Sequence, residues 1–565
     1  MAAESSKGTD AQLASDLADK SLEHPTEISK AADDLASGNV DEEGDEDDDE
    51  GGEDEQTTGV SGTGSTAAKK KKKKPRKKKK KATADDEPPE LIPATTAAAS
   101  KPKGAPVQDL QALLNQLALS QGPKKEGKAP EDYKFWKTQP VPQFQAPNLL
   151  QTTSSSNGES LPEGAILPDK VCRASAKPEP GALLDGFEWC LVDLENDSEI
   201  QELYDLLDNH YVEDADASFR FRYSKQFLSW ALKPPGWKKE WHIGVRTTSQ
   251  EDKKGRLVAF IAGIPVTMKV GESKFNATEI NFLAIHRKLR GKRLAPELIK
   301  EVTRRCYLNG IYQALYTAGT LLPTPVSTCR YFHRSLDWEH LYKTGFSHLP
   351  PGSTELKQKY RYKVESHTSL KGLRPMKKED VPAVKDLLTR YLDRFHLRQD
   401  WTDEEIEHWL CSEASKGVVW TSVVEIDGKI TDFVSYYLLE STVLRSNNRQ
   451  DTIRAAYLFY YASESAFAST SAKQTPKQLQ ESLAARLQLL MHDALILAKK
   501  DDFHVFNALT LLDNPLFLRE EKFEPGDGKL HYYLFNWRTK PLGGGVDAEN
   551  RIDVKKMGGI GVVML

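Results

Sequence analysis

After residue 133 one order of helices and strands occurs twice, and this repetition restricts the possible folds more than any other feature of the sequence. In the first half the expected elements are helices at 200–211 and 224–232, strands at 240–246, 256–268 and 277–285, a helix beginning at Pro296, a strand at 313–319 and a helix at 330–342. The helices are predicted from apolar residues three and four positions apart, and the strands from short apolar or alternating runs.

The second half repeats this order with little identity of sequence. Its expected elements are helices at 379–395 and 402–414, strands at 418–426, 429–440 and 453–463, a long helix at 477–499, a strand at 504–512, a short helix at 516–520 and a strand at 529–537. Strands that alternate with helices are typical of mixed α/β folds. The sequence therefore predicts an internal duplication of one mixed α/β unit.

The first 130 residues have a composition that opposes folding. Residues 1–68 contain 20 acidic residues and three lysines, and 12 of the acids fall within the 15 residues 41–55. In the block that follows, Lys69–Lys81, 12 of 13 residues are cationic. Such segments bury too little apolar surface to offset the entropy lost on ordering. We therefore expect a disordered acidic and polylysine tail at 1–130, and the net charge of −5 describes neither block.

The lysine block has two interpretations. Alone, such a block is most often a solvated tail or a nuclear localisation signal. It also suits electrostatic tethering to a phosphate-rich surface such as the ribosome or another RNA. No aromatic residue interrupts Lys69–Lys81, so contacts through phosphates are expected rather than base stacking. In neither interpretation is the block the main activity.

The cysteines and the apolar runs bear on the compartment. The five cysteines lie far apart and form no CxxC or Cys/His cluster with metal-ligand spacing, which predicts a reducing compartment and no metal site. The first residues lack the apolar core of a signal peptide, and the longest apolar run, 257–268, is too short and too interrupted to span a bilayer. We expect a cytoplasmic protein without a transmembrane segment, with ribosome association as a candidate role of the lysine block.

The stretch Glu279–Cys306, EINFLAIHRKLRGKRLAPELIKEVTRRC, is the most informative segment. A buried strand runs through a cationic loop, His286–Arg293, into a helix with Pro296 in its first turn, where the missing N–H costs nothing. A helix N-terminus offers free N–H groups and the positive end of a dipole, and Gly291 permits close backbone approach. The loop therefore suits a pyrophosphate, although basic loops are more often only solvated.

Two resemblances follow from this stretch. RGKRLA, Arg290–Ala295, resembles the acyl-CoA pyrophosphate loop of the GNAT acyltransferase superfamily. More narrowly, 279–305 resembles the first signature of the glycylpeptide N-tetradecanoyltransferase (N-myristoyltransferase) family. Further segments resemble that family at 522–537 (KFEPGDGKLHYYLFNW, its second signature), 133–142 (YKFWKTQPVP), 211–224 (YVEDADASFRFRYS) and 315–338 (LYTAGTLLPTPVSTCRYFHRSLDW). The resemblance covers 131–565 and leaves the charged tail outside.

The resemblance implies a fold and a division of labour. The fold is mixed α/β (α+β), with two GNAT-like halves in tandem forming one pseudo-symmetric body with a continuous saddle-shaped sheet. The N-terminal half, 131–365, is expected to bind acyl-CoA. The C-terminal half, 366–565, is expected to bind the peptide and to carry a catalytic C-terminus.

The activity implied is transfer of a myristoyl group from myristoyl-CoA to the α-amine of an N-terminal glycine by direct attack on the thioester. The developing oxyanion needs preorganised donors, and the ammonium group must lose a proton. In the family these tasks fall to the backbone N–H groups at the positions of Phe282 and Leu283, and to the C-terminal carboxylate, here that of Leu565. The apolar, glycine-rich end 558–565 suits a carboxylate carried into a dry interior, where burial raises its pKa.

The ligand contacts implied by the resemblance are carried over residue by residue. No permanently bound cofactor is expected, and myristoyl-CoA is the acyl-donor substrate. Its expected contacts are Tyr133, Lys134, Phe135, Trp136, Phe282, Leu283, Ala284, Ile285, Arg290, Gly291, Lys292, Arg293, Leu294 and Ala295. The peptide groove is expected to involve Tyr211, Val212, Asp214, Phe219, Phe221, Tyr223, Asn281, Thr317, Tyr331, His333, Phe346, Ser435, Tyr457, Asn507, Asp527 and Met564. The expected partners are N-terminal glycine peptides of nascent or cleaved proteins, and a monomer is expected.

Some departures and alternatives stay open. Ala284 stands where many relatives carry cysteine, and Gly291 where many carry serine. A GNAT enzyme with a shorter acyl-CoA would share the cationic loop but would not need the apolar C-terminus. A ribosome or RNA tether would need only the lysine block. If the terminal carboxylate is not the base, His333 or Asp527 is the next candidate.

Overall fold

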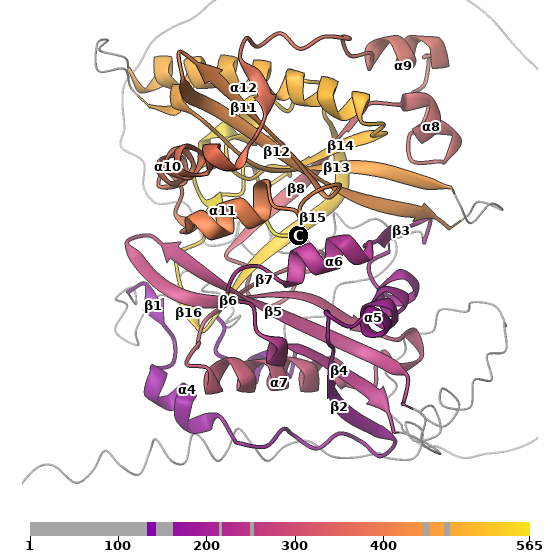
Figure 1. Cartoon of the computed structure of the whole chain (residues 1–565), viewed down its shortest axis with the longest axis vertical. Coiled ribbons are helices and arrows are strands. Elements are labelled where there is room, and N and C mark those ends of the chain that lie inside the picture. Colours follow the sequence, from indigo (N-terminus) through magenta and orange to yellow (C-terminus); the bar gives the residue numbers. More distant parts are fainter. Residues whose placement is uncertain (1–132, 143–161, 214–216, 249–253, 445–450, 468–474) are drawn as a thin grey trace, which may run out of the picture. The chain divides into compact units, whose positions relative to one another are not determined.

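The computed structural model describes residues 133–142, 162–213, 217–248, 254–444, 451–467 and 475–565. The predicted tail, 1–130, lies outside them. Figure 1 shows the strands of the first half mostly in purple to magenta and those of the second half in orange to yellow, with the C-terminus marked between them.

The first half alternates strands and helices more often than the sequence predicted. Its elements are β2 (Phe187–Leu191), α5 (Asp197–His210), β3 (Phe219–Arg222), α6 (Lys225–Leu232), β4 (His242–Thr247), β5 (Leu257–Val270), β6 (Ser273–Ile285), α7 (Leu294–Leu308), β7 (Ala314–Ala318) and β8 (Ser327–Ser335). Before them come β1 (Gly164–Ala165) and α4 (Asp169–Ser175), and after them α8 (Trp338–Lys343) and α9 (Glu355–Arg361).

The second half has the same order. Its elements are β9 (Leu373–Pro375), α10 (Val381–Leu392), β10 (Leu397–Gln399), α11 (Asp403–Leu410), β11 (Val419–Ile426), β12 (Lys429–Val443), β13 (Thr452–Ser463), α12 (Pro476–Lys500), β14 (Val505–Leu509) and β15 (Glu524–Phe535). Two short strands follow, β16 (Trp537–Arg538) and β17 (Ile560–Gly561). Both halves therefore follow the order β-α-β-α-β-β-β-α-β-β, and the predicted duplication is confirmed.

Local sequence explains where the long helices begin. Thr475 and Gln478 form a capping box at the start of α12, and Pro476 occupies the first turn, where no N–H is needed. In α5 the side chain of Asn196 accepts a hydrogen bond from the N–H of Ser198. These caps satisfy backbone donors that have no partner within the helix.

One sheet connects the halves. Among the described residues it has 15 strands in the central order β17-β10-β5-β6-β7-β15-β8-β14-β13-β12-β11-β9, while β1 and β16 pair separately. Within this sheet, strands of one half pair with strands of the other half. β15 pairs with β7 and β8 pairs with β14, and likewise β3 pairs with β12 and β10 pairs with β5. Each exchange has a counterpart in the other half, so the body is pseudo-symmetric.

The expected mixed α/β class is thereby confirmed, with two halves of the same element order in tandem and one continuous sheet. One large apolar core contains residues of both halves, including Leu207 and Phe260 of the first and Phe433 and Leu490 of the second. Burying such a shared core couples the two halves.

The helix predicted at 330–342 is wrong. Residues 327–335 form β8, and only 338–343 are helical. β8 lies between β14 and β15 in the sheet, and Cys329 and Phe332 on it are buried in the core. Residues 327–335 form a strand because they pair with a strand on each side, and local periodicity does not reveal such pairing. The short helix predicted at 516–520 is instead a 3₁₀ turn at Asn514–Leu516.

Candidate active site

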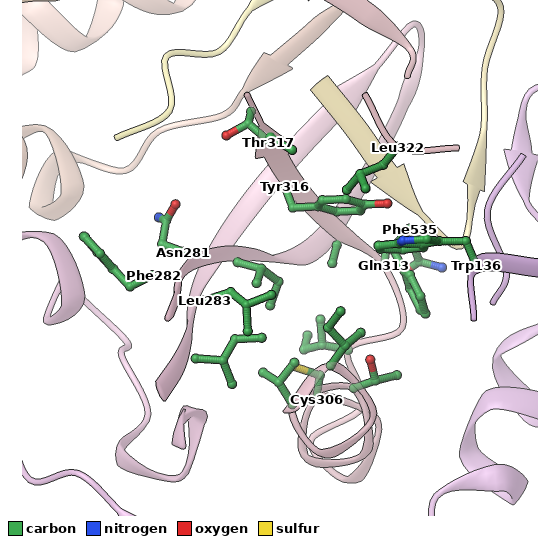
Figure 2. Close-up of a pocket in the computed structure, with 18 of the residues that line it drawn as sticks. Trp136, Asn281, Phe282, Leu283, Cys306, Gln313, Tyr316, Thr317, Leu322 and Phe535 are labelled. Atoms are coloured by element: carbon green, nitrogen blue, oxygen red, sulfur yellow. The ribbon is translucent and has the colours of Figure 1, made fainter. Parts of the chain in front are cut away.

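A cavity of about 330 Å³ lies between β6, β7, α7 and the end of the chain. Its size is in the range of small-molecule sites, roughly 300–1,000 Å³. Ile299, Val302 and Cys306 of α7 contribute an apolar side, and Asn281, Thr317 and Leu565 also line it. Figure 2 shows Asn281, Phe282 and Leu283 on one side and Trp136, Tyr316 and Phe535 on another. The apolar side suits an acyl chain and the polar groups suit a reacting centre.

A bulge in β6 lies at this cavity. Phe260 pairs with Ala284 and Ala262 pairs with Asn281, so two residues of β6, Phe282 and Leu283, lie opposite one residue of β5. Phe282 has φ of 56°, in the left-handed region that side chains rarely adopt. A bulge turns backbone groups away from the regular ladder.

One of these backbone groups points at an oxygen atom. The N–H of Phe282 faces the phenol of Tyr211 and slightly opposes the effect of burial, which raises the pKa of Tyr211 to about 12. Both residues line the cavity. On the other side, β6 and β7 pair only at Thr278–Ala314 and Glu279–Leu315. The two strands therefore separate at the level of the bulge.

The end of the chain is held firmly. β17 pairs in parallel with β10, and the carbonyl of Ile560 accepts a hydrogen bond from the N–H of Leu512. Beyond it, the phenol of Tyr532 donates to the carbonyl of Val562, and the phenol of Tyr460 accepts from the N–H of Val563. Leu565 reaches the cavity. The C-terminus is thus a fixed part of the site.

The cationic loop precedes α7 as predicted, with α7 beginning at Leu294 rather than Pro296. Gly291 has φ of 76°, and Arg293, which caps α7, has φ of 61°. These left-handed residues turn the loop sharply towards the helix. Gly291 and Arg293 are exposed, so the helix N-terminus is open to an anion.

Two arginines of this loop, Arg287 and Arg290, connect it to the segment around the end of α5. Arg287 forms an ion pair with Glu213, which also pairs with Arg220 of β3. Arg290 donates to the carbonyl of His210. Burial and the positive charges nearby lower the pKa of His210 to about 3. Its imidazole is therefore neutral at neutral pH.

The predicted peptide residues form an aromatic cluster that spans both halves. Tyr211 and Phe282 each contact Tyr223, Phe221 packs edge-on to Tyr223 and Tyr457, and Tyr331 packs edge-on to Tyr457. The cluster begins at the cavity, because Tyr211 and Phe282 line it.

A polar group extends the cluster around His333. Its Nδ1 donates to Asn507 Oδ1 at 2.7 Å, and its ring packs edge-on to Phe346, which contacts Phe219. Burial lowers the pKa of His333. A Cβ on Gly526 would lie 2.2 Å from His333 Nε2, so only glycine allows this approach.

The remaining predicted residues have varied positions. Tyr133 donates to the carbonyl of Leu321, and Trp136 stacks on Tyr316, which stacks on Tyr533. Other predicted positions are exposed: Lys134, Val212, Arg290 and Asp527. Three further predicted residues are buried: Ala284, Ser435 and Met564. Partly buried positions are Phe135, Ile285, Lys292, Leu294 and Ala295. Asp214 lies outside the described residues.

Several residues at the site have no signal in the sequence. Glu279 is 6% exposed and accepts a hydrogen bond from Asn281, and Tyr460 and Tyr532 hold the end of the chain. Tyr460 lies on a strand of the second half, about 100 positions before Val563, so only the fold brings them together. The helical spacing of Ile299, Val302 and Cys306 predicts a buried face of the helix, but it does not predict that this face lines a cavity.

Two features are absent from the described residues. No helix among them is long and apolar enough to cross a membrane. The same residues contain no group of three or more His, Cys, Asp or Glu side chains placed to hold a metal ion. All five cysteines are free thiols.

Known proteins match this chain over most of its length. The model of the N-terminal domain of myristoyl-CoA:protein N-myristoyltransferase matches 167–329, and that of the C-terminal domain matches 343–563. Glycylpeptide N-tetradecanoyltransferase of Emericella nidulans is 54% identical over 462 residues, or 81% of this chain and 88% of that protein. The Saccharomyces cerevisiae protein of the same name is 46% identical, over 80% of this chain and 96% of that protein.

A solved structure agrees as well. The crystal structure of S. cerevisiae N-myristoyltransferase with bound myristoyl-CoA has a TM-score of 0.71 and 45% identity, covering 77% of this chain and 100% of that chain. Together with the family matches, it defines the protein as an acyltransferase. More narrowly, the chain belongs to the myristoyl-CoA:protein N-myristoyltransferase family.

Proposed function

We propose that this protein transfers the myristoyl group of myristoyl-CoA to the α-amine of an N-terminal glycine, with the carboxylate of Leu565 as general base and the N–H groups of Phe282 and Leu283 as the oxyanion hole. The observation that carries the proposal is that Leu565, Phe282 and Leu283 line one cavity. Family membership supports the reaction and its acyl donor.

The proton balance requires a base. The α-amine of a peptide titrates near pH ~8, so it is mostly charged at neutral pH. A carboxylate takes one proton from it, the free amine attacks the thioester carbonyl, and the C–S bond breaks. The second proton of the attacking nitrogen passes to the departing sulfur, so that the amide and the CoA thiol are the products. No covalent acyl-enzyme is formed. Support for Leu565 as the base comes from its fixed approach, since Tyr532 and Tyr460 bind the backbone of Val562 and Val563.

The charge that develops on the thioester oxygen requires donors aimed at it. The bulge supplies a reason for such donors, since the N–H of Phe282 already points at an oxygen atom, the phenol of Tyr211. We assign the backbone N–H of Leu283 to the same side of the cavity as that of Phe282. A substrate oxygen at this position would replace a weak acceptor with a negatively charged one, which binds an N–H more strongly.

In this proposal, myristoyl-CoA and the peptide bind to separate surfaces of the protein. The pyrophosphate would bind Arg290–Ala295 at the N-terminus of α7, supported by the left-handed turn at Gly291. The acyl chain would lie along α7. The peptide would follow the aromatic cluster towards His333. We assign acyl-CoA binding to 131–365, and peptide binding with the base to 366–565, although Tyr211 and Phe221 of the first half also contact the peptide path. Ribosome association through Lys69–Lys81 stays a prediction.

A transfer assay tests the proposal. The purified chain is incubated with a glycine-initiated peptide, with an otherwise identical alanine-initiated peptide as the control, and with acyl-CoAs of two to sixteen carbons, and products are weighed by mass spectrometry. We expect transfer to the glycine peptide alone, with a preference for the fourteen-carbon donor. No transfer to the glycine peptide, or a preference for acetyl-CoA, would contradict the proposal.

A further inference from the structure

A buried carboxyl group without a cation lies beside the proposed reacting centre. Glu279 is 6% exposed on β6, and in the described part of the chain no Lys, Arg or His lies within ion-pair distance of it. Its Oε1 accepts a hydrogen bond of 2.7 Å from Asn281 Nδ2. Burial raises the pKa of Glu279 to about 7. A carboxyl group in such a position destabilises a fold and is typical of functional sites.

The strand geometry puts this carboxyl group behind a cavity residue. Glu279 and Asn281 are two positions apart on β6, so their side chains share a face of the sheet, and the bulge begins directly after them. Asn281 lines the cavity together with Leu565, whereas Glu279 is not among the lining residues. Glu279 therefore reaches the cavity only through Asn281.

The chemistry of the ionised carboxylate sets the direction of the amide. Above its pKa of about 7, Glu279 is mainly ionised and only accepts hydrogen bonds, so it binds the NH₂ end of the asparagine. The Oδ1 of Asn281 is then left as an acceptor, and among the described residues it has no hydrogen-bond partner. Figure 2 shows this amide among the residues that line the cavity. A free acceptor in the cavity that Leu565 also lines suits an amine, which brings only N–H donors to the carboxylate and the amide.

We propose that Glu279 is a positioning residue that holds the amide of Asn281 with its oxygen towards the incoming α-amine. This inference rests on the proposed function. Without Glu279, the amide can turn and present its NH₂ group, a donor, to a donor-bearing amine. The expected effect is on the binding and alignment of the peptide and not on the acyl donor.

The test is a double-mutant cycle in the full chain. Glu279→Gln keeps the size of the side chain but can bind either end of the Asn281 amide. We expect kcat/KM for the glycine peptide to fall about tenfold, mainly through KM, while the Kd of myristoyl-CoA stays within twofold. In an Asn281→Ala background, Glu279→Gln should change kcat/KM less than twofold, since its effect passes through the amide.

The outcomes separate this inference from the proposed function. If the unmodified chain transfers no acyl group to the glycine peptide, the proposed function fails. If it does, and Glu279→Gln retains full kcat/KM or lowers it equally in both backgrounds, the inference is overturned. Asp493→Asn is the matched control, because Asp493 is fully buried, forms hydrogen bonds to the N–H groups of Ser369 and Leu370, and does not line the cavity. It should lower the unfolding temperature without raising KM for the peptide.

Discussion

The phenol oxygen of Tyr460 accepts a hydrogen bond of 3.0 Å from the backbone N–H of Val563, two residues before the end of the chain. Tyr460 belongs to β13, in the middle of the sheet, and is 1% exposed. The position of the terminal carboxylate is therefore set in part by a side chain that does not itself line the cavity.

Replacing Tyr460 with phenylalanine should misplace the end of the chain. The N–H of Val563 would be left buried without an acceptor, which costs about 1–3 kcal/mol of unfolding free energy. We expect kcat to fall about 100-fold, because a displacement of ~1 Å at a reacting group has effects of this order. The Kd of myristoyl-CoA should be unchanged. Urea unfolding and steady-state kinetics measure the two effects.

The neighbouring tyrosine is the control for this variant. Tyr461 is also buried, and its phenol donates to Asn514 Oδ1 and accepts from the N–H of Asp513. Tyr461→Phe should lower stability to a similar degree with little change in kcat. Equal losses of kcat in both variants would mean that general destabilisation, and not the chain end, is responsible.

Moving the terminal carboxylate should stop the chemical step. Deleting Leu565 withdraws the carboxylate by one residue, and adding one glycine after it pushes the carboxylate away. We expect either change to lower the single-turnover rate by at least 100-fold, the order of effect of removing a positioned base. Leu565→Ile, which keeps a carboxylate at the same position, should retain most of the rate. Full turnover in both length variants would assign the base elsewhere, with His333 or Asp527 next.

The sequence predicted the long elements well, but it missed several short strands and assigned one strand of the sheet to a helix. Strands and helices with strong periodicity, such as β12 and α12, were predicted within a few residues, because their patterns are local. The short strands β3 and β10 were missed, and β8 was predicted as a helix. These elements owe their structure to partners in the other half, which no local pattern reveals.

The same distinction applies to the site. Asn281, Phe282, Leu283 and Leu565 were all predicted through the resemblance to the family, the first three within one continuous motif, and all four line the cavity. Tyr460 and Glu279 were not, since an isolated tyrosine in a strand reads as core packing and a glutamate before Ile280 reads as part of a motif. Their contacts depend on how the strands align.

The glycines near the chain end should tolerate substitution unequally. A Cβ on Gly559 would lie 2.2 Å from the carbonyl oxygen of Gly543, so Gly559→Ala must move the backbone. Gly558 has φ of +84° with open space around its Cβ position. Gly558→Ala should cost about 1–2 kcal/mol, the left-handed penalty, and keep kcat within threefold.

Kinetics and thermal unfolding of the two variants check this difference. We expect Gly559→Ala to lower kcat at least tenfold, because the displaced backbone leads to Leu565. If Gly558→Ala is the more damaging substitution, the close approach of Gly559 to Gly543 does not control the end of the chain.

Acid should destabilise the fold through His242. Its Nε2 donates to the carbonyl of Leu232 at 3.1 Å, its ring stacks on Trp237, and burial lowers its pKa to about 4. In the unfolded chain the pKa is ~6.5. Above that pH the stabilising contribution is complete, and it falls as the pH drops from ~6.5 towards 4, by about 1.4 kcal/mol per pH unit.

Urea unfolding between pH 7 and pH 4.5 measures this dependence. His242→Asn should unfold with a shallower dependence on pH, because the proton uptake of the unfolded imidazole is gone. The exposed His348, changed to asparagine, is the control. Parallel pH dependences for His242→Asn and the unmodified chain would contradict the prediction.

Arg290 should bind the pyrophosphate and not the acyl chain. The open N-terminus of α7 and the exposed guanidinium of Arg290 together suit a doubly charged anion. We expect Arg290→Ala to raise the KM of myristoyl-CoA about tenfold, as for the loss of one charge-assisted contact of ~1.5 kcal/mol.

Myristoyl-pantetheine, which carries the same thioester without a pyrophosphate, is the control substrate. Its KM should be the same for the unmodified chain and for Arg290→Ala, because it has no pyrophosphate for the Arg290 side chain to bind. A matched substitution at Lys274, whose ammonium pairs with Asp400 on a different part of the sheet, should leave both KM values unchanged. An equal rise in KM for the two donors would show that Arg290 acts through the shape of the site, by its hydrogen bond to the carbonyl of His210, and not through the pyrophosphate.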